Sequence, residues 1–162
     1  MKLMNHTEIE TQEVKRLKIS HRSIYTDIII EADAPKVWEV LTDTASYKNW
    51  ATFLIDIQGE ILHNETITAF FQVNPEKEKI NEIAHRITVK EGSEFYWSEK
   101  GPGGIVDNHH FKVVPLEKGR SRFIQSDELK GGLTFLLGGN LSKMYLNGYQ
   151  AFNRALKKEV ES

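Results

Sequence analysis

A series of short strands that ends in one long helix is the feature that most constrains this chain. Strand-like runs follow one another between residues 55 and 130, and short turn signals such as Glu91-Gly92 and Lys118-Gly119 separate them. Connections this short join antiparallel neighbours, because a parallel crossover needs a dozen or more residues. The predicted strands are Ile55–Leu62, Thr66–Val73, Asn81–Lys90, Glu94–Lys100, Ile105–Pro115 and Ser121–Lys130.

One more strand and two short helices come before this series. β-Branched residues alternate along Ser23–Glu31, as in a half-buried strand. Asp33 then suits a helix N-cap, and Pro35 suits a first helical turn. A second short helical turn begins at Thr42 and runs through Tyr47. The sequence therefore places two short helices between the first and second strands.

The C-terminal segment has the periodicity of an amphipathic helix. Leu141, Tyr145, Gly148, Phe152 and Leu156 recur at steps of three or four residues, so one stripe of the helix is buried. The expected fold is α+β: a seven-stranded, strongly curved antiparallel sheet wrapped around a long C-terminal helix. Residues 1–20 form an N-terminal arm or a short extra element, and residues 21–162 form a single domain.

Composition excludes several classes of protein. The chain has 162 residues, which is enough for one domain. Lys and Arg number 21 against 23 Asp and Glu, and this balance argues against a general nucleic-acid binder. The absence of cysteine excludes disulfides, thiolate metal sites and cysteine nucleophiles. There is no apolar run long enough to span a membrane and no signal-peptide pattern, so we expect a cytoplasmic protein.

Three motifs resemble one known superfamily over residues 22–160. The first is the run Ile30–Asp43, followed by Tyr47 and Trp50; the second is the hairpin of His109–Pro115 and Gly119–Leu133; the third is the closing helix with Tyr149, Phe152, Asn153 and Leu156. Together they resemble the START-like, helix-grip superfamily, also called the Bet v 1-like or polyketide cyclase/dehydrase and lipid-transport family.

This resemblance implies a deep cavity between sheet and helix that holds an apolar or amphipathic small molecule. The superfamily includes lipid and sterol carriers, polyketide cyclases, hydrolases, quinone-binding proteins and chaperone activators. A fold shared by carriers and enzymes does not by itself choose a function.

Strand parity independently predicts which side chains face the helix. Alternate residues of a strand point to the same side, and the aromatic and aliphatic members mark the inward side. The inward sets are Ile83, His85, Ile87 and Val89; Phe95, Trp97 and Glu99; His109, Phe111 and Val113; and Phe123, Gln125, Asp127 and Leu129.

Hairpin geometry then pairs these side chains across the sheet. Trp97 is expected opposite His109, Phe111 opposite Gln125, Val113 opposite Phe123, and His109 opposite Asp127. His85 and Glu99 form a second expected pair. A buried His109–Asp127 pair is either a proton-transfer pair or a fixed polar pair that shapes the cavity or binds a ligand carbonyl or hydroxyl.

Three features near the helix have two interpretations each. Phe135–Gly139 is a hydrophobic lid or a simple start of the helix. Gly148 allows close packing or makes room for a ligand, and Trp50 and Phe53 belong to the cavity wall or to the core. The full set of expected ligand-binding residues is Trp50, Phe53, Phe71, His85, Ile87, Phe95, Trp97, His109, Phe111, Phe123, Gln125, Asp127, Phe135, Leu141, Met144, Tyr145 and Gly148.

The leading functional hypothesis is binding or transport of a hydrophobic or amphipathic small molecule, such as a lipid, polyketide, isoprenoid or aromatic compound. One alternative is a cyclase/dehydrase-like enzyme that uses His109 and Asp127. The other is a protein-interaction module with an exposed apolar patch beyond about 600 Å². We expect no metal, because His109 and His110 point to opposite faces, and no cofactor. We expect no nucleic-acid partner, a monomer or homodimer, and compatibility with transient membrane contact.

Overall fold

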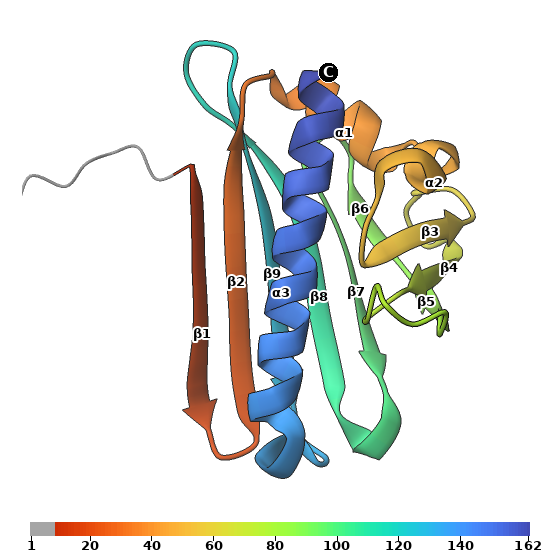
Figure 1. Cartoon of the computed structure of the whole chain (residues 1–162), viewed down its shortest axis with the longest axis vertical. Coiled ribbons are helices and arrows are strands. Elements are labelled where there is room, and N and C mark those ends of the chain that lie inside the picture. The colour runs from red at the N-terminus through yellow and green to blue at the C-terminus, as the bar shows by residue number, and fades with distance from the viewer. Residues whose placement is uncertain (1–8) are drawn as a thin grey trace, which may run out of the picture.

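Residues 9–162, the part of the chain that the computed structural model describes, form two antiparallel sheets and one long helix (Figure 1). The strands are β1 (Glu10–Lys18), β2 (His21–Ile30), β3 (Leu54–Gln58), β4 (Thr66–Phe71), β5 (Asn81–Arg86), β6 (Thr88–Lys90), β7 (Glu94–Lys100), β8 (Val106–Pro115) and β9 (Ser121–Lys130). The helices are α1 (Ala34–Thr42), α2 (Tyr47–Trp50) and α3 (Thr134–Glu161), with single 3₁₀ turns at Thr44–Ser46 and Pro102–Gly104.

The larger sheet has the strand order β1-β2-β9-β8-β7-β6, and α3 lies along one of its faces (Figure 1). All its neighbouring strands are antiparallel. The α+β architecture, the long C-terminal helix and the two short helices after the strand at residues 23–31 are confirmed.

The expectation of a single seven-stranded sheet is wrong, because the expected strand Asn81–Lys90 is divided at Ile87. Both backbone polar groups of Ile87 form hydrogen bonds with the turn between β3 and β4. The Ile87 N–H donates to the Glu65 carbonyl at 3.0 Å, and the Asn64 N–H donates to the Ile87 carbonyl at 2.9 Å. The chain therefore changes sheets there. β5 pairs with β4 in a three-stranded sheet of order β3-β4-β5, and β6 joins the larger sheet.

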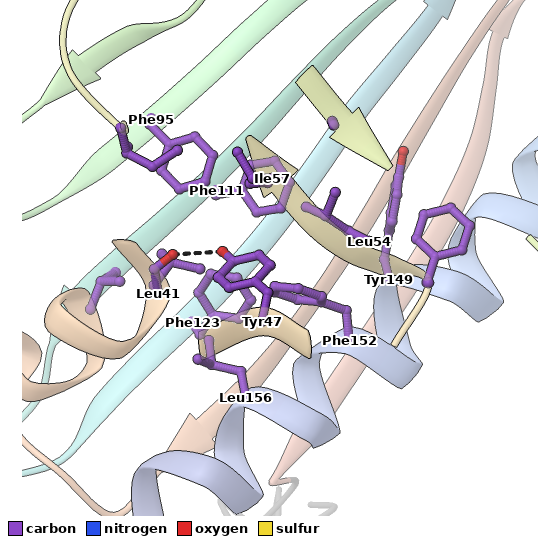
Figure 2. Close-up of a cluster of buried hydrophobic side chains, with 14 of the residues drawn as sticks. Leu41, Tyr47, Leu54, Ile57, Phe95, Phe111, Phe123, Tyr149, Phe152 and Leu156 are labelled. Carbon is purple, nitrogen blue, oxygen red and sulfur yellow. Dashed lines mark hydrogen bonds between the residues drawn. The ribbon is translucent and has the colours of Figure 1, made fainter. Parts of the chain in front are cut away.

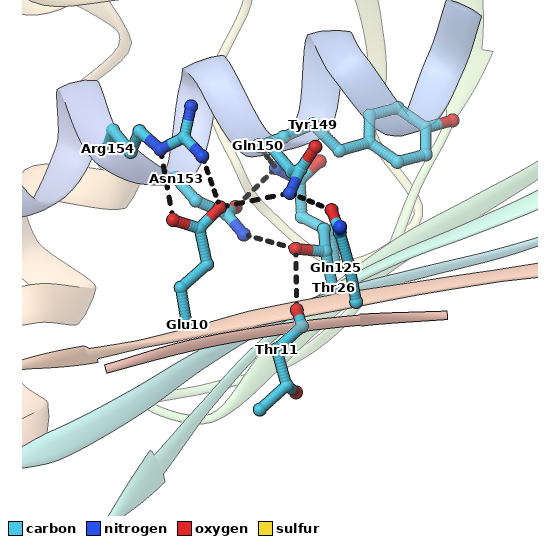
Figure 3. Close-up of polar contacts among 9 residues, drawn as sticks. Glu10, Thr11, Thr26, Gln125, Tyr149, Gln150, Asn153 and Arg154 are labelled. Carbon is cyan, nitrogen blue, oxygen red and sulfur yellow. Dashed lines mark hydrogen bonds and ion pairs between the residues drawn. The ribbon is translucent and has the colours of Figure 1, made fainter. Parts of the chain in front are cut away.

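The N-terminal region contributes a strand rather than a loose arm. β1 pairs with β2 along its length, from Glu10 opposite Ile28 to Lys18 opposite His21. The Glu10 carboxylate also accepts hydrogen bonds from Arg154 and Gln150 of α3 (Figure 3). The folded unit therefore begins before residue 21, and residues 1–8 of the expected arm lie outside the described part.

The packed core lies between the larger sheet, α1, α2 and α3 (Figure 2). Asp33 caps α1 as expected, accepting a hydrogen bond from the Lys36 N–H at 3.2 Å, and Pro35 stands in the first turn. Tyr47 is fully buried, and its hydroxyl donates to the Leu41 carbonyl at 2.6 Å. The largest fully buried side chains of this core are Trp97, Tyr47, Phe95, Phe111, Phe123 and Phe152.

The helix α3 begins at Thr134, so Phe135–Gly139 is its first part rather than a lid before it. Gly138 allows this early start, since a Cβ there would lie 2.8 Å from the Thr134 methyl and 3.2 Å from Cγ of Arg22. The close contact seats the first turns of α3 on β2. Phe135, Leu136 and Leu137 remain exposed on the outer side of the helix.

Candidate ligand-binding site

Ionisable and aromatic side chains gather on the inner face of the larger sheet, beside α3, and His85 joins them from β5 of the smaller sheet. Strand parity brings them together, because odd-numbered residues of β7, β8 and β9 point toward the helix. The helix adds two tyrosines four residues apart, which share its inner stripe. We call this group the inner polar cluster; its members are His85, Trp97, Glu99, Asp107, His109, Asp127, Tyr145 and Tyr149.

His109 is a buried, neutral member of the cluster. Its ring stacks on Tyr149 with centroids 4.3 Å apart, and its Nε2–H donates to Gln125 Oε1 at 2.9 Å. The Gln125 amide nitrogen in turn donates to the Tyr149 carbonyl and to Asn153 Oδ1 (Figure 3). Burial lowers the pKa of His109 to about 3, so the imidazole stays uncharged at neutral pH.

Asp127 accepts hydrogen bonds from groups other than His109. The Tyr149 hydroxyl donates to its Oδ2 at 2.7 Å, and the Asn108 N–H donates to its Oδ1 at 3.0 Å. The pairing of β8 with β9 is open between Val106 and His110, and the Asp127 carboxylate binds the backbone in that gap. Burial raises the pKa of this carboxyl group.

His109 and Asp127, which were expected to act as a pair, instead make separate contacts, His109 to Gln125 and Asp127 to Tyr149 and the Asn108 backbone. The other opposed pairs, Trp97 with His109, Phe111 with Gln125 and Val113 with Phe123, are all present.

Asp107 and Tyr145 extend the cluster toward solvent. Burial, with a smaller contribution from the negative charge of Asp127, raises the pKa of Asp107 to about 7. Burial, together with the charges of Asp127 and Asp107, raises the pKa of Tyr145 to about 12. These mutual effects place the two carboxylates and the phenol in one electrostatic environment.

His85 and Trp97 are buried polar residues without hydrogen-bond partners. Their rings stack with centroids 4.4 Å apart and an interplanar angle of 13°. Both ring nitrogens of His85 and Nε1 of Trp97 lack a partner, and only Glu99 Oε1, at 4.0 Å, approaches His85 Nδ1. Burial lowers the pKa of His85 to about 4. Unpartnered buried groups cost free energy, so these atoms are where a polar group of a ligand would be accommodated.

The remaining expected site residues are divided among three places. Phe71 lies at the cluster, with ring centroids 6.4 Å from His85 and 6.5 Å from Trp97. Leu141 packs half-buried against the core, whereas Phe135 and Met144 are 56% and 36% exposed. The structure therefore does not bring Phe135 and Met144 to the cluster. The residues that belong to the packed core are Trp50, Ile87, Phe95, Phe111 and Phe123.

Gly148 makes room for Phe53 rather than for open space. A Cβ at residue 148 would lie 2.2 Å from the Phe53 ring, so the ring occupies a notch in α3. Phe53 also has a left-handed backbone with φ of 67°, which is strained for a bulky residue. Close packing is therefore the interpretation of Gly148 that this structure supports.

Three cluster residues were outside the expected binding set. One is Glu99, which was expected only as the partner of His85; the other two are Asp107 and Tyr149, and the sequence carries a signal for each. Asp107 has the same parity as His109 and Phe111 on β8, so the alternation rule includes it. Tyr149 follows Tyr145 by four residues on the buried stripe of α3. Neither signal says that the two side chains meet near Asp127, because that contact joins different elements.

Two hollows have volumes of about 360 and 310 Å³, and only the second touches the inner polar cluster, because Asp127 is among its lining residues. The first lies between α1, the turn after β3 and the turn before β7, and its lining includes Trp38, Asp43 and Glu91. The second lies over β2, β8 and β9, mostly on the face that points away from α3. Neither corresponds to the deep sheet–helix cavity that the resemblance implies.

Residues 9–162 contain no cluster of three or more His, Cys, Asp or Glu side chains that could hold a metal ion. Within the same residues, no helix has both the length and the apolar character needed to cross a bilayer.

Solved structures of known proteins share this arrangement. A START superfamily protein from Mycobacterium smegmatis superposes with a TM-score of 0.68 at 12% identity, over 86% of this chain and 97% of the other. An aromatase/cyclase from a Streptomyces species gives 0.65 at 18% identity, over 87% and 94%. Norcoclaurine synthase from Thalictrum flavum gives 0.62 at 16% identity, over 86% of each chain.

Sequence comparison adds no closer relative, since no family model matches the chain and no curated protein matches it. The structural likeness, with a long C-terminal helix packed on a large antiparallel sheet, confirms the resemblance at the level of the fold. The chain therefore has the helix-grip fold that these solved structures share.

Proposed function

We propose that this protein binds a hydrophobic or amphipathic small molecule between the inner face of the larger sheet and α3. The observation that supports this most directly is the pair of unpartnered, buried polar residues His85 and Trp97 in an otherwise aromatic setting. Ligand sites in proteins combine an apolar lining with a few fixed polar groups, and the inner polar cluster has this composition. In this conformation Phe53 fills the space beside α3, so binding includes a displacement of that ring.

Extraction and probe binding test the proposal together. Protein purified from an expression host is denatured, and released small molecules are identified by mass spectrometry; Nile red titration then measures binding to the emptied protein. Trp97→Phe removes the unpartnered N–H and is expected to weaken binding about 5- to 10-fold, the usual value of one hydrogen bond.

Trp38→Phe is the matched control, because Trp38 is also a buried tryptophan but donates to Glu91 away from the cluster. We expect it to bind like the wild type. A protein that releases no ligand and binds no Nile red, or equal effects of the two substitutions, would contradict the proposal.

A second candidate function is proton-transfer catalysis of the cyclase/dehydrase kind. The observation that favours it is Asp107, whose pKa of about 7 suits a general acid or base and which is less buried than His109. Asp107→Asn should then abolish turnover of a bound, ketone-containing substrate while Nile red binding persists. Unchanged turnover in this variant would exclude Asp107 from such a role.

A further inference from the structure

We propose that the ligand of the inner polar cluster is a cation, specifically a protonated amine attached to an apolar or aromatic body. This inference rests on the proposed function and names the class of ligand. Three carboxylates, Glu99, Asp107 and Asp127, would face the ammonium group.

The first step of the argument is the missing counter-charge. In residues 9–162 the three carboxylates have no Lys or Arg nitrogen within 4.0 Å. Other shielded carboxylates of this protein do have one: Asp27 is paired with Arg122 at 3.3 Å, and Glu94 with Lys90 at 2.7 Å. Buried carboxylates usually have a cationic partner, so the buried Asp127 and the half-buried Asp107 are exceptions within their own molecule, whereas the Glu99 side chain is 36% exposed.

The two buried histidines of the cluster do not supply the missing charge, and His110, which acts on Asp127, is paired with Glu94 at 2.8 Å. Burial lowers the pKa values of both His85 and His109 well below neutrality, so both rings are uncharged. The charges that act on Asp107 from Asp127 and Glu99 are negative and oppose its ionisation. An added cation would relieve this repulsion, whereas an anionic ligand would increase it.

Independent support comes from the unpartnered polar atoms beside these carboxylates. His85 is 2% exposed, and its Nδ1 faces Glu99 Oε1 at 4.0 Å without forming a hydrogen bond. A neutral imidazole nitrogen that lacks a proton accepts a hydrogen bond, and an ammonium group is a donor with three N–H bonds. A bound amine would therefore satisfy a buried acceptor and a carboxylate at one place.

Aromatic rings lie beside these groups, with Trp97 next to His85 and the two tyrosines next to Asp127 and Asp107. Trp97 stacks on His85, while Tyr145 and Tyr149 stack on each other with centroids 6.0 Å apart. Tryptophan and tyrosine faces attract cations, and Phe71 and Phe53 add apolar surface for the rest of the molecule. The site thus combines negative charge with an apolar lining, which suits an amphipathic amine.

A matched series of ligands tests the inference by calorimetry at pH 8. The series is 4-phenylbutylamine, 4-phenylbutanol and 4-phenylbutanoate, which share one apolar body and differ in charge. We expect the amine to bind at least 10-fold more tightly than the alcohol, and the carboxylate to bind most weakly. Glu99→Gln and Asp107→Asn should each weaken amine binding about 10-fold and alcohol binding by a clearly smaller factor, because only the amine loses a charge–charge attraction.

Glu82→Gln is the matched control, because Glu82 lies exposed on β5 outside the cluster. Equal affinity for the three ligands, or tightest binding of the carboxylate, would overturn the inference and leave the proposed function intact. Absence of amine binding would overturn the inference as well, and Nile red titration of the same sample then shows whether the proposed function survives. Thermal unfolding of each variant establishes that the protein is folded.

Discussion

The inner polar cluster shows at the residue scale how burial fixes protonation. His109 is enclosed by Tyr149 and Gln125, and the hydrogen bond to Gln125 leaves the proton on Nε2. A charged imidazole would be desolvated there without a carboxylate in contact. The folded protein therefore keeps this ring neutral over a pH range in which an exposed histidine becomes charged.

This neutrality predicts a pH-dependent contribution of His109 to stability. Its pKa is about 3 when folded and about 6.5 in an unfolded chain, so only the unfolded state takes up a proton as the pH falls from 7 to 5. The stabilising contribution is present above pH 6.5 and is lost toward acid. The free energy of unfolding of the wild type should fall by about 2 kcal/mol more than that of His109→Gln over this range.

Urea unfolding at pH 7 and pH 5 measures this difference. The comparison with the variant is needed because the pKa of Asp107 is raised in the folded state. Protonation of Asp107 therefore increases the free energy of unfolding as the pH falls, which opposes the effect of the histidine. Parallel pH dependence in the two proteins would contradict the buried, neutral state of His109.

At the scale of elements, the notch at Gly148 joins α3 to the segment that leads into β3. Phe53 packs its ring into this notch and also contacts the Phe71 and Tyr149 rings, with centroids 5.5 and 5.6 Å away. The helix thereby loses some intrinsic stability at a glycine and gains a close contact with a neighbouring element.

Substitution by alanine at two glycines of the same helix should change the stability of the protein in opposite directions. Gly139→Ala has open space and is expected to stabilise the protein by up to about 1 kcal/mol, the helix-propensity difference. Gly148→Ala should destabilise it by about 1–3 kcal/mol, because the new methyl group overlaps the Phe53 ring. Chemical denaturation of each variant measures the two effects.

A double variant identifies the cause. If the overlap with Phe53 is responsible, Gly148→Ala should cost less in a Phe53→Ala background than in the wild type. Equal costs in the two backgrounds, or a stabilising Gly148→Ala, would show that the notch does not set the position of this ring.

At the scale of the whole molecule, β1 protects the edge of the larger sheet. It pairs with β2, its Thr11 hydroxyl donates to the buried Asp27 carboxylate at 2.8 Å, and its Glu10 binds Arg154 of α3. Strand, sheet and helix are thus connected through a segment whose sequence is mostly polar.

Deletion of residues 1–18 should lower the melting temperature by several degrees and promote concentration-dependent aggregation. The deletion exposes the β2 edge and removes a hydrogen bond from a buried carboxylate. Calorimetry with light scattering tests this expectation. The double substitution of Glu13 and Lys15 by alanine is the control, because this exposed pair contributes little. Equal melting temperatures for the deletion and the wild type would refute the role of β1.

The sequence predicted those features that depend on local pattern. Alternation along β7, β8 and β9 predicted the pairs Trp97–His109 and Phe111–Gln125, and periodicity predicted the buried stripe of α3. The N-cap at Asp33 was predicted from a single residue and its neighbouring proline.

Features that depend on contacts between distant segments were not predictable in this way. The alternation of Asn81–Lys90 continues through Ile87, yet the turn at Asn64 and Glu65 divides the strand. Register placed Asp127 opposite His109, but its carboxylate binds the Asn108 backbone and Tyr149 instead. Both outcomes follow from competition for hydrogen-bonding groups, which a one-dimensional pattern does not record.

Ile87, where the chain passes from β5 of the smaller sheet to β6 of the larger one, limits how far the two sheets can move apart. Its two backbone hydrogen bonds and its buried side chain join the two sheets at this point, so under the proposed function we expect the angle between them to stay constant when a ligand binds. The space for the proposed ligand would then come from movement of α3 and of the chain around Phe53. Deuterium uptake at the Ile87 amide should accordingly be as slow as at amides in the centre of β9, with or without ligand. Rapid uptake would show that the hydrogen bonds of Ile87 open.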